Sequence, residues 1–204
     1  AHHPLIFSPL KSVQQGQPIG DMVRLSMTHE IGIYSAHTNF DQVDDGTADV
    51  LAQLMELTQV APIVPTQPNV GYGRVGHLPQ AMTLQQVLQT VQTQLAPPDL
   101  IYSPEADLAA PVQRLAVLGG SGASFLKAVV KTGAEAYLTS DCKFHQFQEA
   151  RDRGVILIDA GHYATERPAC DRLVGKLLAL GAETARLSDR DEDFRQFFAA
   201  PFSA

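Results

Sequence analysis

The sequence has no tryptophan, only two cysteines among its 204 residues, and a low share of charged residues, 18%. Two thiols cannot build a disulfide framework, and such sparse cysteine favours a cytoplasmic location. No apolar run approaches the length of a membrane span and no signal-peptide pattern opens the chain, so a membrane protein is not expected. A positive excess is also missing: 15 Lys and Arg against 22 Asp and Glu give a formal net charge of −7, which argues against binding to duplex nucleic acid.

What is present is a globular composition, 45% hydrophobic, in a chain long enough for one large domain or two small lobes. In the second half of the chain, apolar strand patterns alternate with helical ones. The expected strands are 114–118, 136–139 and 155–158, and the expected helices are 124–131, 144–153 and 162–180. This alternation predicts a parallel sheet flanked by helices.

The first half of the chain is less regular. Its expected helices are 21–30, 47–58 and 83–95, the last with Thr83 as N-cap, and its expected strands are 31–36 and 72–78. Residues 59–71 are expected to form a loop, and residues 96–111, with four prolines, are the best candidate for a linker. We therefore predict an α/β protein with two α/β lobes, residues 1–108 and 109–204, each a mostly parallel sheet flanked by helices.

Residue types that bind metals follow several of the expected strands. His37 and Asp41 come after 31–36, Asp141 and His145 after 136–139, and His162 and Glu166 after 155–158. Ligands of an open parallel sheet bind beyond the carboxyl ends of its strands, so these side chains are expected at one edge. Their convergence is a stronger signal than any one motif.

Each motif taken alone also allows a plainer interpretation. His162 and Glu166, four apart at the start of a helix, can reach one ion, or they form an exposed first turn with a carboxylate favoured by the helix dipole. His2 and His3 are a vicinal pair whose side chains can bind two ions, or they are the remnant of a purification tag. Asp41 alone is a helix or turn cap.

A glycine-rich run, Gly119-Gly120-Ser121-Gly122, joins an expected strand to an expected helix. Backbone N–H groups there can hold a phosphate, although the glycine spacing matches neither a P-loop nor a dinucleotide fingerprint. The alternative is a tight turn without a ligand.

Several segments together resemble one family, the GTP cyclohydrolase I type 2 homologues, which are YbgI-like dinuclear-metal proteins. The matching segments are HHPLIF at 2–7, YSAHTNFD at 34–41, GYGRVG at 71–76, GGSG at 119–122, TSDCKFH at 139–145 and DAGHYATE at 159–166. They run in the family's order across nearly the whole chain, and jointly they are very specific.

The resemblance implies a metal site in the cleft between the two lobes, with two divalent ions per chain, which are zinc, iron or manganese. One ion would be held by His3, Asp41 and Glu166. The other would be held by His2, His162 and Glu166, so that Glu166 bridges both. The family also forms a homohexamer, a trimer of dimers.

The activity that the family name implies is metal-dependent hydrolysis of GTP or a related nucleotide, a small phosphorylated substrate. Two ions a few ångström apart can activate a water molecule and stabilise an oxyanion. His37 and His145 are candidate catalytic residues, for orienting a ligand or transferring a proton, or they are structural histidines. The alternative function is a non-catalytic metal-handling or regulatory protein, and a third is a scaffold whose ring is its function.

The sequence departs from the family pattern at several points. Family members carry several tens of residues with a Trp-Asp-Asn motif before the histidine pair, and the missing tryptophan agrees with the absence of that stretch. We therefore expect an N-terminally truncated fragment whose first lobe is incomplete at its N-terminus. Some members insert a third domain between the lobes, for which residues 96–111 leave no room, and Ser140 stands where the family usually has Gly.

Overall fold

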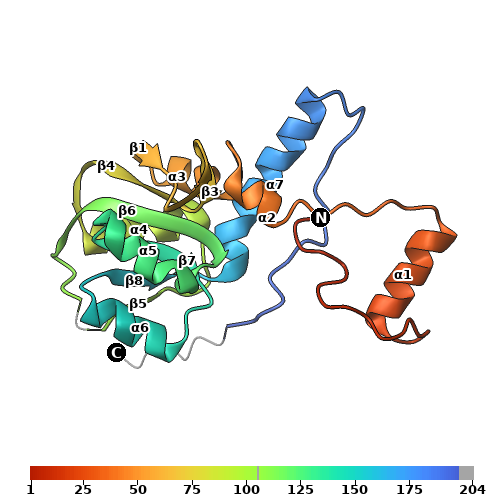
Figure 1. Cartoon of the computed structure of the whole chain (residues 1–204), viewed down its shortest axis with the longest axis horizontal. Helices are drawn as coiled ribbons and strands as arrows, with labels where there is room; N and C mark the ends of the chain where they lie inside the picture. Colours follow the sequence, from red (N-terminus) through yellow and green to blue (C-terminus); the bar gives the residue numbers. More distant parts are fainter. Residues whose placement is uncertain (105, 198–204) are drawn as a thin grey trace. The chain divides into compact units, whose positions relative to one another are not determined.

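The computed structural model describes residues 1–104 and 106–197. The chain divides into two compact units, Ala1–Phe40 and Asp41–Ala204. The helices are α1 (Pro18–Thr28), α2 (Thr38–Gln42), α3 (Thr47–Leu54), α4 (Leu84–Leu95), α5 (Leu126–Thr132), α6 (Phe144–Asp152) and α7 (His162–Ala179), with a 3-10 helix at Ala123–Phe125 (Figure 1). The strands are β1 (Thr58–Ala61), β2 (Val64–Gln67), β3 (Val70–Tyr72), β4 (Arg74–Thr83), β5 (Ile101–Tyr102), β6 (Pro111–Ser121), β7 (Ala136–Ser140) and β8 (Ile156–Asp159).

The larger unit is built on a six-stranded sheet in the order β1-β4-β6-β7-β8-β5. The centre of this sheet, β6, β7 and β8, is parallel. The outer pairs, β1 with β4, β4 with β6, and β8 with β5, are antiparallel. The prediction of an α/β fold with a parallel central sheet flanked by helices is confirmed.

The division into two lobes at residue 108 does not match the division that the structure shows. β4 pairs with β6 from Arg74 opposite Val117 to Thr83 opposite Pro111, so strands from both predicted lobes share one sheet. β5, inside the predicted linker, pairs with β8. Position 105 of that linker and positions 198–204 of the predicted second lobe lie outside the described residues.

The core of the larger unit lies on both faces of the sheet, because successive side chains of a strand point to opposite faces. On β6, Leu115 and Val117 join a cluster formed with α3, α4 and α7, while Ala116 joins a cluster formed with α5 and α6. β7 repeats this alternation: Leu138 joins the first cluster and Tyr137 the second. The helices thus sandwich the sheet, and the end of β6 and the start of α7 are held within this packing.

Local predictions succeed where side chains decide the structure. Helix α4 begins with the predicted cap: the Gln86 N–H donates to Thr83 Oγ1 at 3.2 Å, and the Thr83 N–H donates to Gln86 Oε1 at 2.8 Å. The loop predicted over 59–71 is wrong, because most of these residues form β1, β2 and β3. Pro65 fits in β2 because, among the strands that the structure describes, β2 pairs with β3 alone and keeps one edge open.

The smaller unit, Ala1–Phe40, contains α1 and the start of α2. Pro18 begins α1, where its missing N–H costs nothing, and the Asp21 carboxylate accepts a hydrogen bond from the Gly16 N–H at 3.1 Å. The strand predicted over 31–36 is wrong: this segment has no regular secondary structure. None of the helices that the structure describes is long and apolar enough to cross a membrane.

Candidate metal centre

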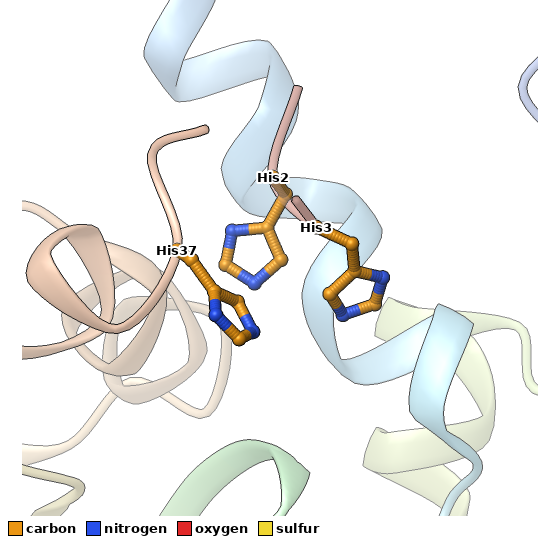
Figure 2. A group of neighbouring side chains, drawn as sticks. All are labelled: His2, His3 and His37. Atoms are coloured by element: carbon orange, nitrogen blue, oxygen red, sulfur yellow. The ribbon is translucent and has the colours of Figure 1, made fainter. Parts of the chain in front are cut away.

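Three histidines gather in the smaller unit: His2, His3 and His37 (Figure 2). Each offers a ring nitrogen, and these three atoms lie within 4.8 Å of one another. The ring centroids are 5.1 Å apart for His2 and His3, 5.2 Å for His2 and His37, and 5.3 Å for His3 and His37. Nitrogens bound to one tetrahedral ion at about 2.1 Å lie about 3.4 Å apart, which is within the limit that the three ring nitrogens satisfy.

Backbone pairing explains why the vicinal histidines meet His37. The Ala1 nitrogen donates to the Tyr34 carbonyl at 2.9 Å, and the Ala36 N–H donates to the Ala1 carbonyl at 2.9 Å. The first residues therefore run beside 34–36, although this pairing is too short to make a strand.

The surroundings of His2 fix its orientation. Its Nδ1 lies 2.7 Å from the Ala36 carbonyl oxygen, which can only accept, so Nδ1 carries a proton and donates it. In the neutral ring, the lone pair is then on Nε2, an atom shielded from solvent. A backbone carbonyl that fixes the tautomer in this way is the usual partner of a histidine that binds a metal.

In the larger unit, His162 lies between two carboxylates. His162 Nε2 is 3.1 Å from Glu166 Oε2, and its Nδ1 is 2.6 Å from Asp141 Oδ2. The hydrogen bond to Glu166 raises the pKa of His162 to about 9, against the opposing effect of burial, and the bond to Asp141 adds to the rise. The predicted pairing of His162 with Glu166 on one helix face is therefore present. The sequence places Asp141 at the same edge of the sheet, but it does not assign the contact of Asp141 with His162.

Asp159 holds the backbone next to Asp141 and the backbone next to His162. Its Oδ2 accepts from the Cys142 N–H at 2.8 Å, and its Oδ1 accepts from the Gly161 N–H at 2.9 Å. The residues after β7 and after β8 are thereby tied together, which places Asp141 beside His162. Burial, and next the Asp159 carboxylate, raise the pKa of the Cys142 thiol well above its usual range.

The glycine-rich run is stabilised from within the protein. The Gly120 N–H donates to Thr165 Oγ1 at 3.0 Å, and the Gly122 N–H donates to Thr139 Oγ1 at 3.0 Å. Thr139 Oγ1 in turn donates to the Gly120 carbonyl at 3.1 Å. These two N–H groups are already used, so for them the interpretation as a turn without a phosphate fits better. Moreover, β6 continues through Ser121, so the turn begins later than predicted.

Asp41 belongs to α2 and is half-buried, with its Oδ1 shielded from solvent. The two residues after it are held by Arg74, whose Nη2 donates to the carbonyls of Gln42 and Val43 at 3.2 and 3.4 Å. Arg74 is almost fully buried, pairs through Nε with Asp49, and donates through Nη1 to two carbonyls of its own glycine-rich segment at 2.9 and 2.8 Å. The GYGRVG segment thus has a structural use that its sequence did not reveal.

His145, the other candidate catalytic histidine, is exposed on α6. It lines a shallow surface hollow with Gln148, Glu149, Asp152 and Arg153, all from α6 or its C-terminal end. Five of the predicted site residues thus form two groups, one in each unit: His2, His3 and His37 in the smaller, and His162 and Glu166 in the larger. Asp41 and His145 also belong to the larger unit.

A family model for Duf34/NIF3, described as NGG1p interacting factor 3, matches residues 1–188. The chain belongs to this family. A protein from a Nostoc species named GTP cyclohydrolase 1 type 2 homolog is 70% identical over 198 residues, which are 97% of this chain and 75% of that protein. A Streptococcus pneumoniae protein of the same name is 32% identical, over 79% of this chain and 61% of its own length. The resemblance that the sequence motifs carried is confirmed.

Solved structures agree on the fold. A Bacillus cereus protein related to NIF3 matches with a TM-score of 0.83 at 20% identity, over 97% of this chain and 82% of that one. Reduced HcgD from Methanocaldococcus jannaschii matches with a TM-score of 0.74 at 28% identity, over 87% of this chain and 68% of that one. The chain spans 75% of the length of the Nostoc relative and 61% of the length of the Streptococcus relative.

Proposed function

We propose that the protein binds two divalent metal ions, zinc, iron or manganese, and uses them to hydrolyse GTP or a related nucleotide. The proposed ligands are His2, His3, Asp41, His162 and Glu166. The observation that carries the proposal is the cluster of His2, His3 and His37, whose ring nitrogens lie within 4.8 Å of one another. His2 and His3 are the proposed ligands in this cluster, and imidazole suits a borderline divalent ion.

The donor set of the larger unit also fits a metal. Carboxylate and imidazole on successive turns of α7 are a common ligand pair, and a divalent ion would take the place of the proton that His162 Nε2 shares with Glu166. Asp141 would keep its hydrogen bond to Nδ1, the arrangement that orients a metal-bound imidazole.

When bound, the ions supply Lewis acidity that activates water and stabilises negative charge. The chain's own residues orient the site: the Ala36 carbonyl fixes the His2 ring, and Asp141 fixes the His162 ring. His37, beside His2 and His3, is placed to orient a ligand or to move a proton. A phosphate of the substrate would need donors other than the N–H groups of Gly120 and Gly122.

The test measures metal content of the purified protein and turnover of GTP and guanosine, each with and without chelator. We expect about two ions per chain and turnover that chelator abolishes, with GTP preferred. Turnover that survives chelator would remove metal from the mechanism, and equal turnover of guanosine would remove phosphate recognition. Bound, exchangeable metal with no turnover would instead support a metal-handling protein.

A further inference from the structure

Gly120, at the end of β6, lies directly against the Glu166 side chain. A Cβ built on Gly120 would fall 2.1 Å from Glu166 Oε1, 3.1 Å from its Cδ and 3.2 Å from His162 Nε2. No methyl group fits at such distances, so the Glu166 carboxylate occupies the space that a side chain at position 120 would take.

The backbone of Gly120 cannot move aside to make room. Its N–H donates to Thr165, the residue before Glu166, and its carbonyl accepts from Thr139 on β7. One bond ties it to α7 and the other to the sheet. Its φ of +66° is a conformation that L side chains rarely adopt, which is a second reason for glycine here.

We propose that Gly120 is a positioning residue for the metal site: its missing side chain lets the Glu166 carboxylate lie beside His162 Nε2. The inference rests on the proposed function, in which Glu166 bridges two ions. It gives the GGSG segment a use other than phosphate binding. Because the Glu166 carboxylate ends a flexible side chain, while Gly120 is held at both its N–H and its carbonyl, an added methyl group moves the carboxylate and leaves the fold in place.

The experiment compares Gly120→Ala with Gly133→Ala. Gly133 ends α5 with a φ of +74°, and a Cβ there would meet nothing within 4 Å. Both variants carry the backbone strain of alanine at positive φ, so we expect both to lose about 2 to 8 °C in Tm, measured with chelator present. Only Gly120→Ala should weaken metal binding, by about 10- to 100-fold in titration calorimetry.

A rescue experiment separates displacement of the carboxylate from general damage. Glu166→Asp shortens the side chain by one methylene group and so withdraws the carboxylate from the position of the added Cβ. On its own it should weaken metal binding, since the carboxylate no longer reaches as far. Adding Gly120→Ala to Glu166→Asp should then cost less than about threefold more, so the two losses are not additive.

The proposed function and the positioning role can fail separately. If the wild-type protein binds no metal, the proposed function fails. The positioning role is then tested by NMR, through the imidazole nitrogen resonances of His162 in metal-free protein. These resonances should shift in Gly120→Ala and stay unchanged in Gly133→Ala. Gly120 does not position Glu166 if the His162 resonances are unchanged in both variants. The same conclusion holds if the wild-type protein binds metal and Gly120→Ala binds it as tightly as Gly133→Ala.

Discussion

Glu166 and His37 belong to the same proposed site, but their removal should have unequal effects. The Glu166 carboxylate is proposed to contribute negative charge to both ions, whereas His37 contributes one imidazole ring beside His2 and His3. We expect Glu166→Gln to lose most of its metal and His37→Ala to retain more, as measured by elemental analysis after dialysis. Equal loss, or greater loss from His37→Ala, would contradict the assignment of Glu166 as the bridge.

Cys142 lies next to Asp141 but should be a slow nucleophile. Burial and the nearby Asp159 carboxylate raise its thiol pKa, so at a given pH less of the reactive thiolate forms than in a free thiol. We expect iodoacetamide at about pH 8 to label Cys142 at least about tenfold more slowly in the folded protein than in urea-unfolded protein. The measurement is mass spectrometry of the Cys142 peptide in a Cys170→Ser background. Equal rates in the two states would show that the thiol is not protected.

Residue-scale predictions from sequence were good where helix geometry alone sets the distance. Four-residue spacing on a helix predicted that His162 meets Glu166. The third partner, Asp141, depends on a left-handed φ of +54° after β7 and on the hydrogen bonds of Asp159 to Cys142 and Gly161. Such contacts join three segments far apart in the sequence, and no local pattern reports them.

At the scale of elements, one buried ion pair joins strand β4 to helix α3, and the same Arg74 holds the loop after Asp41 through the carbonyls of Gln42 and Val43. Arg74 and Asp49 have side chains only 3% and 17% exposed. We expect Arg74→Met to cost about 3–5 kcal/mol in the free energy of unfolding, because it leaves the Asp49 charge unpaired and several carbonyls without their donor. Urea unfolding with chelator present provides the measurement.

The control for Arg74 is Arg153→Met. Arg153 pairs with Glu149 at 2.9 Å on α6, but these side chains are 40% and 35% exposed. Solvent screens such a pair, so its loss should cost less than about 0.5 kcal/mol. If Arg74→Met costs no more than this control, the buried pair does not stabilise the packing of β4 against α3.

Elements whose hydrogen bonds are made within a few residues were predictable, and elements whose hydrogen bonds need a distant strand were not. The Thr83 and Gln86 capping box lies within four residues, so the start of α4 was visible in the sequence. The short strands β1, β2 and β3 owe their existence to pairing with β4 or with each other. Three prolines in the same stretch predicted a loop, because proline lacks the N–H group that a central strand needs. An edge strand does not need this donor at every position, so the prolines are compatible with these strands.

At the scale of the whole molecule, strand partners escaped prediction. Alternating apolar patterns showed the parallel βαβ run of the second half, because local helices connect its strands. The antiparallel pairing of β4 with β6 spans the proline-rich segment 96–111 and is decided by register between distant residues. A composition shift therefore suggested a lobe boundary where the sheet is continuous.

The proposed ligands come from both units, and this gives a test of the site as a whole. His2 and His3 belong to Ala1–Phe40, while Asp41, His162 and Glu166 belong to Asp41–Ala204. If both groups serve the same two ions, removing either group removes the same metal.

We therefore expect His2→Ala/His3→Ala and Glu166→Gln each to lose most of the metal of the wild-type protein. Combining all three changes should add little further loss, because energies of residues that share a ligand are not additive. Elemental analysis of the two variants and their combination measures this, and His29→Ala, which removes an exposed histidine on the C-terminal side of α1, is the control that should keep its metal. Partial losses that sum in the combined variant would mean that the two groups bind separate ions, and the five residues would then not form one dinuclear site.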